Sequence, residues 1–88
     1  MKVNDQVIYR SIAGEHMLIP VGEVALKQNG LYVLNEVGAL IWTLLSEGKT
    51  PDEIIAQIAE EYDAPQDTIR EDYNELTEKL YQAGLLVD

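Results

Sequence analysis

The sequence predicts an α+β fold, a three-stranded antiparallel sheet followed by a three-helix bundle, because two hydrophobic periods divide the chain. Residues 7–34 contain short apolar runs with period two and turn signals between them, a pattern typical of strands. Residues 35–84 carry apolar residues three to four positions apart, a pattern typical of helices. When the strands all precede the helices in the chain, the favoured fold is α+β, with the helices grouped apart from the sheet. With 88 residues, we expect one domain over residues 1–88.

The predicted strands are separated by glycine-containing turns. Ala13-Gly14-Glu15 is the first turn, and Asn29-Gly30 is the second, which is a strong hairpin signal. Between these turns, Val24-Ala25-Leu26 is either a loop or a short strand, and both interpretations stay open. The three predicted strands are residues 7–12, 16–20 and 31–34. A sheet this small has two edges, so the last strand is expected to have an edge in need of a partner.

Each predicted helix begins at a recognisable start signal. Asn35 can cap the first helix through its side-chain oxygen. The second begins at Thr50, where Pro51 suits the first helical position and Glu53 completes a capping box. The third begins near residues 63–65 and runs to Gly84.

Apolar stripes on these helices predict the core. Residues 85–87 are expected to fold back onto it. Trp42 lies about 140° from Val37 on the first helix, so core packing and a partner-facing position both remain open. The stripes consist of Val37, Leu40, Ile41, Leu44 and Leu45, then Ile54, Ile55, Ile58, Ala59 and Tyr62, then Ile69, Tyr73, Leu76, Leu80 and Ala83.

The formal net charge of −10 lies mostly in the second half of the chain. Residues 50–88 contain eleven acids and two bases, whereas residues 1–49 contain five acids and four bases. An acidic surface repels phosphate backbones, so we expect no nucleic-acid partner. A solvated acidic surface and a basic partner protein are the two interpretations. With no secretory signal and no apolar run longer than four residues, we expect a cytoplasmic protein without a membrane span.

The residue types offer little for catalysis. The chain has no cysteine, and its single histidine, His16, is expected to be structural. The carboxylates follow helical surfaces and lack the glycine-containing loop of an EF-hand. We therefore expect no enzyme activity, no metal and no cofactor.

Four segments of the chain resemble the PqqD family, named for pyrroloquinoline quinone biosynthesis protein D. They are "IAGEHMLIPVG", "NGLYVLNEVGALIW", "EEYDAP" and "EDYNELTEKLYQAGLL". The resemblance covers nearly the whole chain, and "LNEVGALIW" is its most specific part. It implies a winged-helix-like RiPP recognition element, a module that binds the leader segment of a ribosomally made precursor peptide.

In such modules the leader adds as a further strand beside the third strand, in a groove bounded by the third helix. The resemblance therefore implies peptide contacts at Leu31, Tyr32, Val33 and Leu34. It also implies presentation of the peptide to a modifying enzyme, often a radical S-adenosylmethionine enzyme. A free strand edge also suits pairing with a second copy of the chain, so a homodimer is expected to be possible.

One lane of the third predicted helix contains no acid. With 100° per residue, this lane lies beside the core stripe and consists of Gln66, Arg70, Asn74, Thr77 and Tyr81. We hypothesise that the lane and Tyr73 form the helical wall of the groove, since they would not repel an acidic leader. The alternative is chance, with Arg70 bracing neighbouring acids at spacing i, i+4. A winged-helix DNA-binding regulator is the competing function, although this helix supplies only Arg70 and Lys79 for phosphates.

Overall fold

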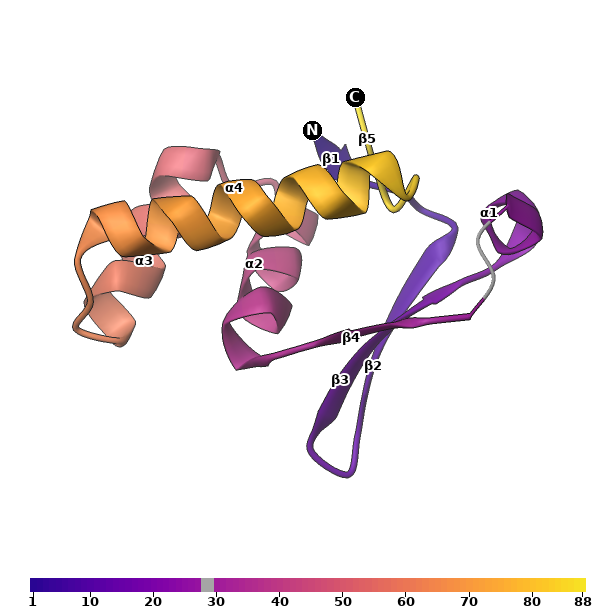
Figure 1. The fold of residues 1–88 in the computed structure, drawn as a ribbon, viewed down its shortest axis with the longest axis horizontal. Coiled ribbons are helices and arrows are strands. Elements are labelled where there is room, and N and C mark those ends of the chain that lie inside the picture. Colours follow the sequence, from indigo (N-terminus) through magenta and orange to yellow (C-terminus); the bar gives the residue numbers. More distant parts are fainter. Residues whose placement is uncertain (28–29) are drawn as a thin grey trace.

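The computed structural model describes residues 1–27 and 30–88, and it packs three long helices against a three-stranded antiparallel sheet (Figure 1). The predicted α+β order, strands first and long helices after them, is confirmed. The elements in chain order are β1 (Lys2–Val3), β2 (Val7–Ile12), β3 (Glu15–Pro20), α1 (Gly22–Lys27), β4 (Tyr32–Leu34), α2 (Glu36–Ser46), α3 (Pro51–Glu61), α4 (Gln66–Gln82) and β5 (Leu86–Val87).

The sheet has the strand order β2-β3-β4, with both pairs antiparallel. Leu18 of β3 lies opposite Tyr32 of β4, and Met17 lies opposite Val33. Leu18 is fully buried, so this face of the sheet meets the helices. The third strand begins one residue later than the predicted 31–34. Asn29, half of the predicted Asn-Gly turn, lies outside the described residues.

The prediction for Val24-Ala25-Leu26, a loop or a strand, is wrong, because these residues belong to the helix α1. Glu23 lies in its first turn and Lys27 in its last, where each charge complements the helix dipole. Gln6 anchors the segment: its carbonyl accepts a hydrogen bond from the Val21 N–H at 2.8 Å. Six residues are too few to show a helical period, so the sequence pattern could not reveal this helix.

The two ends of the chain form a second, two-stranded sheet in which β1 pairs with β5. Val3 lies opposite Leu86, and the Asn4 side chain donates a hydrogen bond to the Gly84 carbonyl at 3.0 Å. The expected return of residues 85–87 to the core is confirmed, since Leu85 and Leu86 are at most 1% exposed. The pairing with β1 was not predicted, because two-residue strands carry no periodicity.

The core lies between the sheet and α2, α3 and α4, and it confirms most of the predicted stripes. Trp42 is 3% exposed, which confirms the core interpretation over the partner-facing one. Tyr62 is the main departure, since it is 39% exposed at the end of α3. No helix among the described residues has the length and apolar character needed to cross a membrane. The buried helical residues include Ile41, Leu44, Leu45, Ile54, Ile55, Ile58, Ile69, Tyr73 and Leu80.

The predicted caps of α2 and α3 are both present. The Asn35 side chain accepts a hydrogen bond from the Gly38 N–H at 2.7 Å. At α3, the Thr50 hydroxyl accepts from the Glu53 N–H at 3.2 Å, and the Glu53 carboxylate accepts from the Thr50 N–H at 2.9 Å. The Thr50 backbone N–H is the main cause that lowers the pKa of Glu53 below its ordinary value. This contribution to stability is present at neutral pH and is lost as the pH falls through the lowered pKa.

Removing the cap should destabilise the domain. We expect Thr50→Ala to lower the free energy of unfolding by about 1 kcal/mol, because the Glu53 N–H loses its acceptor. Urea denaturation followed by circular dichroism measures the change. Thr68→Ala is the matched control, since Thr68 is exposed and lies inside α4 rather than at a capping position. Equal losses in the two variants would contradict a capping role.

Candidate functional site

β4 forms one edge of the sheet, as the sequence predicts. It pairs with β3, and no strand lies on its other side within residues 1–27 and 30–88. Its side chains alternate, with Leu34 6% exposed toward the core and Val33 61% exposed toward solvent. Leu31, just before the strand, is exposed, and Tyr32 is half-buried. An edge strand leaves alternate N–H and C=O groups without a ladder partner. β4 therefore offers backbone donors and acceptors to another extended chain.

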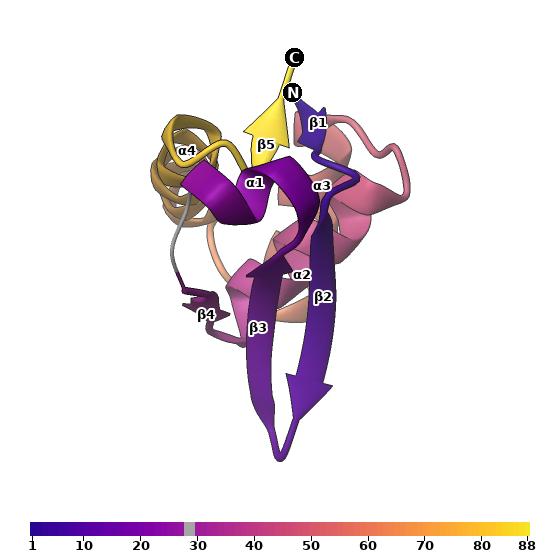
Figure 2. The same ribbon diagram turned by 90° about the vertical axis from the view of Figure 1, so that its right-hand side faces the viewer.

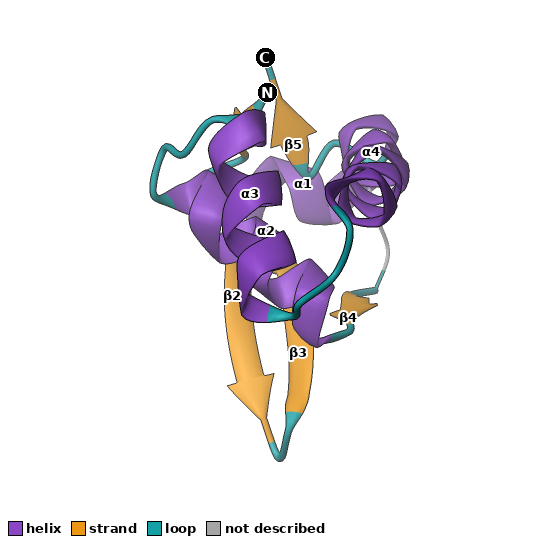
Figure 3. Cartoon of the chain, turned by 90° about the vertical axis from the view of Figure 1, so that its left-hand side faces the viewer, coloured by secondary structure: helices purple, strands orange, loops and turns teal. Residues whose placement is uncertain are grey.

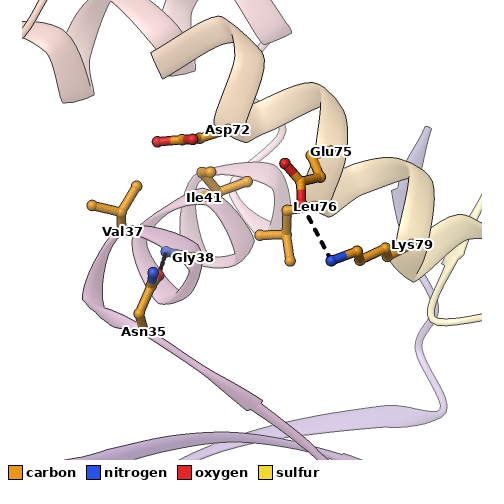
Figure 4. A pocket seen from close by; sticks show the side chains of 8 residues that line it. All are labelled: Asn35, Val37, Gly38, Ile41, Asp72, Glu75, Leu76 and Lys79. Carbon is orange, nitrogen blue, oxygen red and sulfur yellow. Dashed lines mark hydrogen bonds and ion pairs between the residues drawn. The ribbon is translucent and has the colours of Figure 1, made fainter. Parts of the chain in front are cut away.

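α4 runs on the same side of the molecule as this edge. Figure 2 shows β4 nearest to α4, with β3 and then β2 farther away, and Figure 3 shows the same order from the opposite direction. A surface pocket of about 260 Å³ opens where β4 ends, between the first turns of α2 and the middle of α4 (Figure 4). The pocket is lined by Asn35, Val37, Gly38, Ile41, Asp72, Glu75, Leu76 and Lys79.

The pocket combines apolar and charged side chains. Val37, Ile41 and Leu76 supply the apolar part, and the charged part comes from α4 alone. The Lys79 ammonium lies 3.3 Å from the Glu75 carboxylate. Asp72 extends from α4 above Ile41, and it has no ion-pair partner among the described residues.

Gly38 allows α2 to approach α4 closely at this pocket. A Cβ atom on Gly38 would lie 3.1 Å from the Asn35 side-chain oxygen and 3.3 Å from a methyl group of Leu76. Both separations are tighter than ordinary van der Waals contact, so a larger residue would push Leu76 or the cap aside. The glycine of "LNEVGALIW" thus helps to set the width of the pocket.

The predicted acid-free lane of α4 does not face β4. Arg70 donates to Asp52 of α3 at 3.0 Å, which places this part of the lane beside α3. Thr77 is 2% exposed and donates to the Tyr73 carbonyl at 2.8 Å. Tyr73 is 5% exposed, and burial raises its pKa above the ordinary value. The lane therefore contributes to the core and to the contact between helices rather than to a wall beside β4.

The remaining lane residues lie on the same flank. Gln66 and Asn74 are exposed, and the Tyr81 hydroxyl donates to the Asp88 carboxylate at 3.2 Å near the end of the chain. The nearby Asp88 charge raises the pKa of Tyr81. The structure thus brings Leu31, Tyr32, Val33 and Leu34 together, but it separates them from the lane.

The sequence could not show which flank of α4 lies beside β4, for a geometric reason. A helix has a flank on each side of its core stripe, and a helical wheel does not say which neighbour each flank meets. The flank that meets the pocket carries Asp72, Glu75, Leu76 and Lys79, of which only Leu76 was assigned to the core stripe. In the sequence, Leu76 was the residue that could have indicated this flank, because it widens the apolar stripe of the helix in that direction.

A second surface pocket, of about 270 Å³, lies on another side of α2, between the β2–β3 hairpin and the end of α3. The Nδ1 atom of His16 and the Tyr9 hydroxyl share a hydrogen bond of 2.7 Å, which agrees with the expected structural role of His16. The Tyr62 hydroxyl donates to Glu36 at 2.9 Å, and this bond raises the pKa of Tyr62. In the part of the chain that the structure describes, no three His, Cys, Asp or Glu side chains are grouped so that they could hold a metal ion.

The chain is similar to two solved structures over nearly its full length. One is described as "TbiB1 in Complex with the TbiA(beta) Leader Peptide"; it is 32% identical, with 98% of this chain and 94% of that chain covered and a TM-score of 0.82. The other, "Lasso peptide synthetase B1 complexed with the leader peptide", is 17% identical, with 99% and 96% covered and a TM-score of 0.82, and it supports the fold alone. Among curated proteins, none matches the chain.

The family comparison agrees with the motifs of the sequence. The model of the family described as coenzyme PQQ synthesis protein D (PqqD) matches residues 15–86. This match includes β3, β4 and the helices α1 to α4, and hence both walls of the pocket beside β4. The chain therefore belongs to the PqqD family.

Proposed function

We propose that residues 1–88 act as one peptide-binding adaptor, which captures the leader segment of a ribosomally made precursor peptide and presents it to a modifying enzyme. The observation that carries this proposal is the edge of β4, which no strand of the described residues pairs with. This edge lies on the same side as α4 and ends at a pocket. The 32% identical relative is described as a complex with a leader peptide. We propose that this chain also binds a leader peptide, and we assign the binding to β4 because of its edge position in the sheet.

Strand addition explains how such an edge binds a peptide. The leader runs beside β4 and exchanges main-chain hydrogen bonds with it, each of which contributes about 0.5–1.5 kcal/mol. Alternate leader side chains then point toward the helices and toward solvent. Main-chain bonds supply affinity for any extended segment, so the side chains that reach the pocket supply selectivity.

The adaptor role also fits the chemistry of the chain. We propose that the domain is not itself an enzyme, that its partner is a radical S-adenosylmethionine enzyme and that both work in the cytoplasm, where the precursor is made. The single histidine is engaged with Tyr9, and the sequence has no cysteine nucleophile. The same edge of β4 is open to a second copy of the chain, so we propose that a homodimer and the leader compete for it.

A DNA-binding regulator is the competing function, and the charges of α4 argue against it. α4 supplies only two bases, Arg70 and Lys79, and each has an acid of the chain beside it, Asp52 and Glu75. The acids on its surface would repel a nucleic-acid backbone. The comparisons give no support for this function.

A nuclear magnetic resonance titration tests the adaptor. The probe is the TbiA(beta) leader peptide, together with peptides selected by the chain from a random library. We expect the backbone amides of residues 31–34 and of the Asp72–Lys79 flank of α4 to shift. Sedimentation velocity at each titration point distinguishes a peptide complex from a homodimer. Shifts confined to α3 and to the second pocket would refute the proposal.

A further inference from the structure

The pocket at the end of β4 is a place where a side chain of a bound leader could be recognised. If a leader pairs with β4, its residue beside Asn35 lies next to the pocket, so the following inference rests on the proposed function. We infer that this leader residue is a lysine or an arginine, and that Asp72 recognises its positive charge.

The apolar part of the pocket suits the stem of such a side chain. Val37 and Leu76 are only partly buried, so they keep accessible apolar surface at the pocket, whereas Ile41 beneath them is 1% exposed. Lysine and arginine place their methylene groups along apolar surface while the charged end stays near water. A short acid such as aspartate has no comparable stem and would leave this surface uncovered.

The charges at the pocket favour a cation. Two carboxylates, Asp72 and Glu75, line it against one ammonium, that of Lys79. Lys79 is engaged with Glu75, whereas Asp72 has no ion-pair partner within residues 1–27 and 30–88. The net charge of the whole chain, −10, adds a field that attracts cations toward the surface.

Two features of the pocket would attract an acidic leader residue: the positive end of the α2 dipole and the Lys79 ammonium. Both attractions are reduced by neighbouring groups. The first turn of α2 has a positive dipole end, but the Asn35 oxygen already accepts from the Gly38 N–H, and Glu36 adds a negative charge there. The side chains of Lys79 and Glu75 are 66% and 67% exposed, so their ion pair is weak. The summed charge of Asp72, Glu75 and Lys79 is nevertheless negative, whether or not this pair forms. Arg70, on the other flank, is held by Asp52.

Selection from a random peptide library tests the inference with the full chain, Asp72→Lys and Glu71→Lys. Glu71 is an exposed acid of α4 that does not line the pocket, so its variant carries the same charge change as a control. We expect the wild-type chain and Glu71→Lys to enrich peptides with a lysine or arginine at one fixed position. Asp72→Lys should lose this preference or replace it with aspartate or glutamate. Thermal unfolding verifies that each variant is folded, and Asp72→Asn replaces Asp72→Lys if the latter is not.

A charge exchange then excludes a merely structural effect. In one selected peptide the basic residue is changed to glutamate, and calorimetry measures both peptides with the wild-type chain and Asp72→Lys. We expect the glutamate peptide to bind the wild-type chain roughly threefold to tenfold more weakly and to regain affinity on Asp72→Lys. Selected peptides without a fixed basic residue, or with the same preference on Asp72→Lys, would overturn the inference and leave strand addition intact. Selected peptides that do not shift the amides of β4 would overturn the proposed function as well.

Discussion

We expect Tyr32→Pro and Val33→Pro to differ, since one should damage the fold and the other should leave the domain folded but weaken peptide binding. Neighbouring residues of an edge strand direct their N–H groups to opposite sides, and proline removes that donor. One of the two prolines therefore breaks the ladder to β3 and damages the fold. The other removes a donor from the free edge, leaves the domain folded and costs about 1–3 kcal/mol of affinity for a selected peptide, through a lost hydrogen bond and its unpaired partner.

The side chains require their own controls. Val33 is 61% exposed, whereas Tyr32 packs against the core, so Tyr32→Pro also loses packing. Tyr32→Ala and Val33→Ala keep the backbone N–H groups, so they measure the effect of losing each side chain alone. Circular dichroism reports folding, and calorimetry reports affinity. A folded proline variant that binds the peptide as tightly as its alanine counterpart would refute strand addition at β4.

Trp42→Ala should have the largest effect on stability. The Trp42 side chain is 3% exposed in the hydrophobic core, so truncation removes its apolar contacts and leaves a cavity. We expect a loss of about 3–5 kcal/mol in the free energy of unfolding, a large share of the stability of a domain of this size. Urea denaturation followed by circular dichroism measures it, because the variant loses the only tryptophan for fluorescence.

Tyr81→Ala is the matched control for the loss of an aromatic ring. Tyr81 is 43% exposed near the end of α4, so its removal should change the free energy of unfolding by no more than about 0.5 kcal/mol. Equal effects of the two substitutions would contradict the core position of Trp42.

The sequence predicted those elements whose signals are local. The capping box at Thr50 and the cap at Asn35 depend on residues three positions apart, and both are present as predicted. The free edge of β4 followed from the small number of strands. The helix α1 and the pair β1–β5 were missed, because elements of six and two residues are too short to show a period.

The helical wall of the site could not be predicted for a different reason. The position of α4 relative to β4 depends on how the whole chain packs, and two flanks of one helix are equivalent on a helical wheel. The acid-free lane with Arg70 and Tyr81 lies on the flank away from the pocket, and its contact with a peptide stays a prediction. The flank beside the pocket carries Asp72, Glu75 and Lys79, so it contains acids that the lane lacks.

The pairing of β1 with β5 affects how the domain forms during its synthesis. Leu85 and Leu86 belong to the core, and α4 and β1 both adjoin this last segment. A ribosome releases the chain from its N-terminus at about 5–20 residues per second, so the helices emerge before the residues that complete their packing. The core closes only after Leu86 has left the exit tunnel. β4 therefore emerges from the ribosome well before the segment that completes the core, and its edge is open to pairing while the domain is still incomplete.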